Sequence, residues 1–157
     1  MQIRSQSLLL ALLAAVGGCP KNEKTPEWPP LTPYLAIHDA LADDSLDGVK
    51  THGAALHTAL AATAGDLASG EDLREGVTLL ASEELGAARR GFQKISADVI
   101  AYLEQHPEAR KGLMIVHCTM AFDNAGASWV QRVGVVENPY EGKNMLHCGD
   151  KVAWGER

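Results

Sequence analysis

The sequence predicts an α+β domain in which a small antiparallel helical bundle is followed by a C-terminal β-hairpin and a short extended segment. Between Thr32 and about Gln105, apolar residues recur in steps of three and four, the period of a helix with one buried face. After Lys111 the apolar residues form compact runs rich in β-branched side chains, which favour strands. Helices that come first and strands that come last are typical of this fold class.

Four helices are expected in the first part of the chain. The short polar side chains of Thr32 and Ser45 are expected to cap the first two helices at their N-termini. A third helix is expected over Glu71–Leu80, and the longest from near Ser82 to His106. Short loops between them favour antiparallel packing. The residues expected to face the core are Tyr34, Ile37, Leu41, Leu46, Val49, Gly53, Leu56, Leu60, Leu85, Ala88, Phe92, Ile95, Val99 and Tyr102.

Two strands and a last extended piece are expected after residue 111. Apolar runs at 113–116 and 129–136 favour strands. The residues at 123–126 favour a hairpin turn between them, because Asn and Gly accept a positive φ at little cost. A second turn is expected at 138–142, and residues 145–148 are expected to be extended.

The first 18 residues are typical of a secretory signal peptide. Arg4 supplies a basic start, residues 8–16 form an apolar run, and Gly17 and Gly18 precede Cys19. The run is shorter than the roughly 20 apolar residues that span a membrane. The arrangement resembles a bacterial lipobox, in which Cys19 carries the lipid; the alternative is ordinary secretory cleavage that leaves Cys19 as a spare thiol. Residues 19–33 are then expected to be a tether, and residues 34–157 a single globular domain.

These features predict a location in the cell envelope, with the domain lipid-anchored on the periplasmic face. Pro20 and Lys21 replace the aspartate that resembles an inner-membrane retention signal, which favours the outer membrane. The formal net charge of −6 repels phosphate backbones, so nucleic acid is not an expected partner.

Two short clusters in the last third carry soft metal ligands. His117-Cys118-Thr119-Met120 and Met145-Leu146-His147-Cys148 each contain one His, one Cys and one Met. Thiolates and thioethers suit Cu(I) better than magnesium, calcium or manganese. Side chains alternate along a strand, so the whole set cannot converge on two regular strands. A site with two to four ligands is expected, and the candidate metal ligands are Cys118, Met120, Met145, His147 and Cys148.

The same cysteines allow other interpretations. Cys118 and Cys148 could form a disulfide, which would stabilise the fold by about 3 to 4 kcal/mol and remove both thiolates as ligands. Met120 and Met145 would then be packing residues. Cys118 could instead be a reactive redox thiol with an unusually low pKa. A site that binds metal when reduced and is bridged when oxidised is compatible with the first two interpretations.

No catalytic residue is predicted, and the protein is not expected to be an enzyme. His117 is adjacent to Cys118, but neighbours on a strand point to opposite faces, so this imidazole and thiol are poorly placed to react together. The sequence contains neither a glycine-rich phosphate loop nor a serine elbow.

Other polar residues are interpreted as structural. His38 is expected to be a core or solvated histidine, since no second histidine lies four residues away on its helical face. Arg89 is interpreted as a partner of carboxylates on the helix surface. Gln131 lies two residues from Trp129, so it shares that strand face and is expected to hydrogen-bond the turn at Asn138.

Residues spread over most of the chain also match the pattern of a known family. In the last third they are Cys118, Met120, Trp129, Val130, Gln131, Asn138, Pro139, Tyr140, Gly142, Met145, Leu146, Cys148 and Gly149, and the earlier part is represented by Phe92–Ser96 and the helix of Tyr34. By these residues the chain resembles the domain of unknown function 3347 over roughly Tyr34 to Gly149. Members of that family are small periplasmic or lipidated proteins, with similar domains fused to the adaptor subunits of heavy-metal efflux pumps. The resemblance implies metal handling, with Cu(I) or Ag(I) as the ion and an efflux adaptor or another envelope protein as the partner. Family members commonly have Pro after the first cysteine, where this chain has Thr119.

Two functions therefore lead the expectations. The first is a membrane-anchored periplasmic domain that binds a soft metal ion, Cu(I), in buffering or in delivery to efflux. The alternative is a disulfide-stapled domain for protein-protein interaction in the envelope, without metal.

Overall fold

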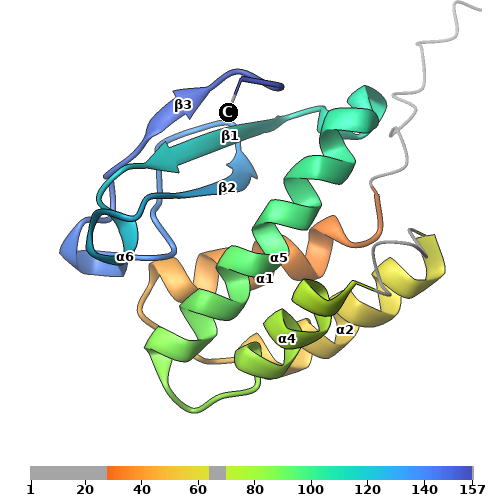
Figure 1. The fold of residues 1–157 in the computed structure, drawn as a ribbon, viewed down its shortest axis with the longest axis horizontal. Coiled ribbons are helices and arrows are strands. Elements are labelled where there is room, and N and C mark those ends of the chain that lie inside the picture. The colour runs from red at the N-terminus through yellow and green to blue at the C-terminus, as the bar shows by residue number, and fades with distance from the viewer. Residues whose placement is uncertain (1–27, 64–69, 157) are drawn as a thin grey trace, which may run out of the picture.

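The computed structural model describes residues 28–63 and 70–156, and it confirms the α+β fold class (Figure 1). The expected signal peptide, the expected lipidation site Cys19 and residues 20–27 of the expected tether lie outside the described residues. The helices are α1 (Leu31–Ala42), α2 (Val49–Thr63), α4 (Glu71–Leu80), α5 (Leu85–Gln105) and the short α6 (Ala121–Asn124), with 3₁₀ turns η1 (Pro107–Arg110) and η2 (Gly142–Asn144). The strands are β1 (Leu113–Cys118), β2 (Ala127–Arg132) and β3 (Asp150–Val152).

The helices form a bundle on one side of the sheet. Helix α5 packs along α4 and also against β2, and α1 packs along α2 and reaches β2 and η2 (Figure 1). Helices α2 and α4 therefore make the layer farther from the sheet. Within the described ranges, no helix is long and apolar enough to cross a membrane.

Ser45, the expected cap of the second helix, and Ser82, near the expected start of the longest helix, each make a local contact before the helix begins. Ser45 Oγ accepts a hydrogen bond from the Asp47 amide at 3.0 Å, and Ser82 Oγ accepts one from the Glu84 amide at 3.1 Å. Each hydroxyl thus closes a small turn just before its helix, because a Ser side chain reaches the amide two residues ahead more easily than a distant helix end. Thr32 lies inside α1, which begins at Leu31.

The folded part also begins earlier than the expected tether end at residue 33. Trp28 is buried, and its ring stacks on that of Tyr102 in α5 with centroids 4.1 Å apart. An aromatic stack of this kind fixes the entry of the chain to the C-terminal half of α5.

The expected hairpin is confirmed, and a third strand completes the sheet. The order is β2-β1-β3, antiparallel throughout. In register, Val116 lies opposite Trp129 and Cys118 opposite Ala127. The last extended element is β3, whereas residues 145–148, expected to be extended, form a turn: the Met145 amide donates to the Gly142 carbonyl at 3.1 Å and the Cys148 amide to the Met145 carbonyl at 2.9 Å.

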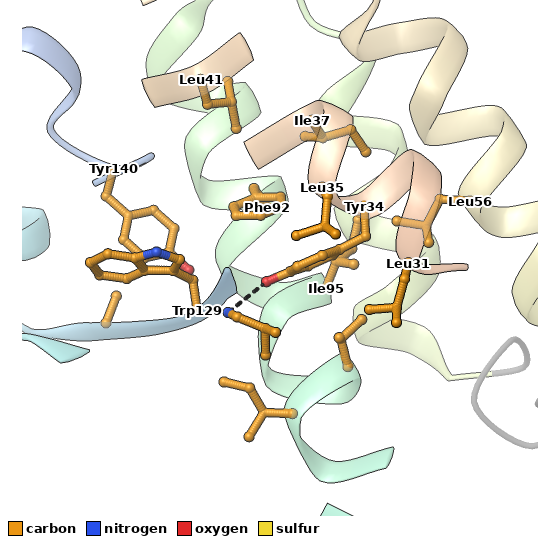
Figure 2. Packing of buried hydrophobic residues seen from close by; sticks show 14 of the residues in the cluster. Leu31, Tyr34, Leu35, Ile37, Leu41, Leu56, Phe92, Ile95, Trp129 and Tyr140 are labelled. Carbon is orange, nitrogen blue, oxygen red and sulfur yellow. Dashed lines mark hydrogen bonds between the residues drawn. The ribbon is translucent and has the colours of Figure 1, made fainter. Parts of the chain in front are cut away.

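The outer edge of β2 is closed by two tyrosines. The Val130 amide donates to the Tyr34 hydroxyl oxygen at 3.0 Å, and the Tyr140 hydroxyl donates to the Ser128 carbonyl at 2.7 Å. Figure 2 labels both tyrosines and marks the bond to the Tyr34 hydroxyl with a dashed line. Tyr34 is fully buried, and its hydroxyl also bonds Ser96 Oγ at 2.9 Å. Burial raises the pKa of Tyr34 far above its usual range, so the phenol is neutral at every working pH.

Tyr34→Phe tests how much this edge contact contributes. The substitution removes the hydroxyl and leaves the Val130 amide without its partner, so the free energy of unfolding is expected to fall by about 1–3 kcal/mol in urea denaturation. Tyr102→Phe, at a half-buried ring, is the matched control and is expected to change it by less than about 0.5 kcal/mol. A loss below about 0.5 kcal/mol in Tyr34→Phe as well would show that Tyr34 acts through ring packing alone.

Candidate functional site: a pair of cysteines

Cys118 and Cys148, thirty residues apart in the chain, meet in the structure. Cys118 is the last residue of β1 and is buried, whereas Cys148 follows η2 and is half-buried. Both are free thiols, and their Sγ atoms lie 2.7 Å apart. The fold therefore brings together the two thiols of the sequence-predicted site.

Gly149 lets the chain approach the sheet closely beside Cys148. A Cβ at this position would lie 2.7 Å from Val116 Cγ1 and 2.9 Å from Trp129 Cη2, both closer than real Cβ contacts. The φ of Gly149 is +142°, which L side chains rarely adopt. The meeting of the two sulfurs thus depends on a glycine directly after the second cysteine.

Asn138 fixes the backbone of the segment that carries Cys148. Its side-chain Nδ2 donates to the Cys148 carbonyl at 2.9 Å, and its Oδ1 accepts from the amides of Tyr140 at 2.8 Å and Glu141 at 3.1 Å. Its own amide donates to the Leu146 carbonyl at 2.7 Å. Asn138 is fully buried, so each of these bonds replaces a bond to water that the backbone has lost.

Arg89 holds the same segment from the helical side. From α5, its Nε donates to the Pro139 carbonyl at 3.0 Å, and its Nη2 donates to Asp44 Oδ1 at 2.6 Å. Asp44 Oδ2 accepts from the Lys143 amide at 3.2 Å. The interpretation of Arg89 as an ordinary surface partner is wrong, because only 13% of its side chain is exposed and its contacts join α5 to residues 139–143. A mixed charge pattern along a helix gives no sign of such a distant partner.

Gln131 has the structural role that the strand pattern predicts. It shares a sheet face with Trp129, whose Nε1 donates to Gln131 Oε1 at 3.0 Å. The same oxygen accepts from the Glu137 amide at 3.1 Å, and Nε2 donates to the Val135 carbonyl at 2.7 Å. A bond to the turn at Asn138 was expected, and the observed bond is to Glu137, the residue directly before it.

The methionines lie close to the cysteines along the chain. Met120 directly precedes α6 and is 49% exposed, which is unusual for a large apolar side chain. Met145 is half-buried in the turn whose carbonyl accepts the Cys148 amide. Phe122 follows Met120 with a φ of +54°, a conformation stabilised by its ring, which packs on Tyr140 with centroids 5.1 Å apart.

The two histidines beside the cysteines differ in their surroundings. His147 is exposed, and its Nδ1 lies 2.7 Å from the Val136 carbonyl. A carbonyl only accepts, so Nδ1 carries the proton and the neutral ring keeps a free lone pair on Nε2, the tautomer of a metal-ligating histidine. His117 instead bonds Ser128 Oγ through Nδ1 at 2.9 Å and, by strand alternation, points to the face opposite Cys118.

The donors at this site are mainly sulfur atoms. Within the described part of the chain, no group of three or more His, Cys, Asp or Glu side chains could hold a metal ion. His147 is therefore not grouped with the two thiols as a third ligand, and a soft ion would meet two sulfur donors here.

The Cys148 thiol keeps its proton at neutral pH. The pKa of Cys148 is raised to about 11, first by its hydrogen bond with Cys118, then by burial, and further by the nearby charges of Glu141 and Asp150. A metal ion or an oxidant must therefore displace this proton when it reacts with Cys148.

Comparison with known families identifies the family of the helical half of the chain. The family model described as "Protein of unknown function (DUF3347)" matches residues 31–111, just over half of the chain. The chain belongs to the DUF3347 family. The DUF3347 match covers α1 to η1 and ends before β1, so the cysteine pair lies outside the matched residues. No curated protein and no solved structure matches the chain significantly.

Gly149→Ala is expected to separate the two thiols. The added methyl group would meet Val116 and Trp129 and would strain the backbone, so the free energy of unfolding is expected to fall by about 1–3 kcal/mol. The reduced variant is expected to oxidise to the bridged form more slowly than the wild type, as measured by mass spectrometry. Gly134→Ala is the matched control, since a Cβ there would meet nothing within 4 Å. Wild-type stability and oxidation rate in Gly149→Ala would contradict the role of the close approach.

Cys118→Ala is expected to make Cys148 more reactive. Its hydrogen bond with Cys118 is the largest cause of the raised pKa, so its removal lowers that pKa and increases the thiolate fraction at pH 9. Alkylation of Cys148 by iodoacetamide, followed by peptide mass spectrometry, should become about tenfold faster at pH 9, as a fall of one pKa unit implies. Met114→Leu, on the same strand, keeps both thiols, so the pH midpoint of Cys148 alkylation should stay near 11. If the pH midpoint of Cys148 alkylation is unchanged in Cys118→Ala, burial is the cause that raises the pKa of Cys148.

Proposed function

We propose that this DUF3347 protein binds Cu(I) between the thiolates of Cys118 and Cys148 and either buffers the ion or passes it to an efflux system. The observation that carries the proposal is the convergence of the two sulfurs at 2.7 Å from distant parts of the chain. A metal ion between two thiolates holds each sulfur at about 2.3 Å, so the sulfurs must move apart by about 1–2 Å. Rotation of the half-buried Cys148 side chain supplies this movement, while Cys118 stays on its strand.

Further donors lie close to the pair along the chain. Met120 and Met145 offer thioethers two and three residues from the cysteines, and His147 would have to turn its free Nε2 toward the pair to act as a third ligand. Cu(I) accepts two to four such ligands, and Ag(I) has similar preferences. The exposed Met120 is suited to take up the ion from a donor in solution, and the buried Cys118 to retain it.

The proposed setting is the cell envelope. The signal-like sequence and Cys19 support a lipid anchor, with the domain on the periplasmic face and preferentially at the outer membrane. The proposed partner is a heavy-metal efflux adaptor or another envelope protein. The net charge of −6 supports contact with cations and disfavours nucleic acid.

A second candidate function is a disulfide-stapled interaction domain without metal. The separation of 2.7 Å between the sulfurs is closer to the 2.05 Å of a disulfide bond than to a metal-bridged pair. A bridge would close a loop of about thirty residues and stabilise the fold by about 3–4 kcal/mol. This candidate predicts that metal ions leave the stability of the oxidised protein unchanged.

Anaerobic titration of the reduced full chain with Cu(I) against a competing chelator tests the proposal. One Cu(I) per chain is expected, with the affinity lowered by about 100-fold in Cys118→Ser and in Cys148→Ser and by about tenfold in Met120→Leu. Met114→Leu is the matched control, since this buried methionine lies on β1 outside the proposed ligand set, and its affinity should equal that of the wild type. If neither cysteine substitution changes the affinity while the air-oxidised protein contains a Cys118–Cys148 bridge, the second candidate replaces the first.

A further inference from the structure

Val133 and Val135 are exposed although their side chains are large and apolar. Their exposed fractions are 63% and 70%, and Met120 is the third such residue in the part of the chain that the structure describes. Scattered apolar side chains on a surface need no explanation, whereas neighbours on one loop are candidates for a contact surface. The two valines lie one residue apart, directly after β2.

The loop that carries these valines is fixed at both ends by its backbone. The Val133 amide donates to the Gly112 carbonyl at 2.9 Å. The Glu137 carbonyl accepts from Nε2 of His38, a buried residue of α1, also at 2.9 Å. The backbone is therefore held by hydrogen bonds while both valine side chains stay outside the core.

The polar residues around the two valines are cationic. Lys111 is exposed and directly precedes Gly112, and Arg132, with 61% of its side chain exposed, directly precedes Val133. Residues 111–112 and 132–135, here named the valine patch, thus carry two positive charges and no negative one, in a chain whose formal net charge is −6.

Two carboxylates border the valine patch. Asp39 and Glu137 line an open cavity of about 270 Å³ together with Arg132 and both valines. Arg132 Nη1 lies 3.8 Å from Asp39 Oδ2, and both side chains are more than half exposed. Ion pairs between such exposed groups are weak, so Arg132 remains able to contact another anion.

The described chain begins at the same end of the domain as the valine patch. The ring of Trp28 stacks on Tyr102, whose ring stacks on His106, each with centroids 4.1 Å apart. Helix α5 ends one residue before His106, and η1 leads from there to Lys111. Figure 1 shows the start of α1, the end of α5 and the start of β1 on one side of the molecule.

This end of the domain is the closest one to the proposed lipid anchor. Cys19 lies nine residues before Trp28, and nine residues span at most about 30 Å when fully extended. That is about the length of α5, whose 21 residues rise by about 30 Å. A domain on so short a tether keeps the entry point of its chain, and with it the valine patch, near the lipid surface.

We propose that the valine patch docks on the lipid bilayer, with Val133 and Val135 among the headgroups and Lys111 and Arg132 in contact with anionic lipids. Apolar contact combined with basic side chains is the chemistry by which protein surfaces bind such membranes. The inference rests on the lipid anchor of the proposed function. Since β1 runs from this patch to Cys118, about 17 Å away, docking would leave the thiol pair clear of the lipid.

Methyl nuclear magnetic resonance of the reduced, metal-free full chain in lipid nanodiscs tests the proposal. The discs contain phosphatidylethanolamine with some phosphatidylglycerol, and a fraction of the lipid carries a spin label on its headgroup. The methyl signals of Val133 and Val135 are expected to broaden, whereas the signal of Met120, which follows the far end of β1, should stay sharp. Equal broadening of all three signals, or broadening of none, would overturn the proposal.

Lys111→Glu is expected to lower the ratio of docked to undocked domains at least about fivefold, the effect of one basic residue at an anionic surface. Lys50→Glu, an equal change of charge at an exposed position of α2, is the matched control and should keep the wild-type ratio. Val135→Asp is the second variant and should also reduce docking at least about fivefold. The same loss in Lys111→Glu and Lys50→Glu would show that net charge alone matters, and the patch would then have no special role.

The remaining outcomes separate this inference from the proposed function. A chain that stays with the nanodiscs without selective broadening contradicts the docking alone, whereas a chain that leaves them contradicts the lipid anchor as well. Valine signals that change with protein concentration and ignore the labelled lipid would assign the patch to contact between copies of the chain, and the proposal would be wrong. The protein is metal-free throughout, so a failed Cu(I) titration leaves these results valid.

Discussion

The arrangement of the site depends on one constraint: the backbone of residues 133–149 is largely without regular secondary structure, and its polar groups must still be satisfied where they are buried. Side chains from three places meet this need. From the sheet, Gln131 hydrogen-bonds the Val135 carbonyl and the Glu137 amide. From the helical bundle, Arg89 hydrogen-bonds the Pro139 carbonyl. Within the segment itself, Asn138 hydrogen-bonds backbone groups that include the Cys148 carbonyl. The position of the second thiol is therefore fixed by polar contacts more than by its own packing.

The sequence predicts the parts of this fold that follow from local periodicity. The helical period identifies α1, α2, α4 and α5, and β-branched runs separated by turn residues identify the hairpin of β1 and β2. The exact helix starts are missed at Thr32 and Ser45, because a short polar side chain can cap a helix or close a turn, and the choice depends on tertiary packing. Strand β3 is missed because three residues at a sheet edge carry too weak a pattern.

The residues of the site could be identified from the sequence, whereas most of its geometry could not. The two clusters of Cys, Met and His contain the cysteines that the fold brings together, and strand alternation separates His117 from Cys118. The convergence of Cys118 and Cys148 needs the close approach at Gly149 and the bonds of Asn138, which join residues through the fold. The contact between His38 and Glu137 spans 99 positions, and no local pattern marks it.

The closed edge of β2 has a consequence for how the protein tolerates crowding. A free strand edge offers unpaired amides and carbonyls to any neighbouring chain. Here the hydroxyls of Tyr34 and Tyr140 occupy those groups at Val130 and Ser128. A neighbouring copy would have to displace two buried phenols before it could add a strand on that side, so copies at high local concentration are kept from joining their sheets there.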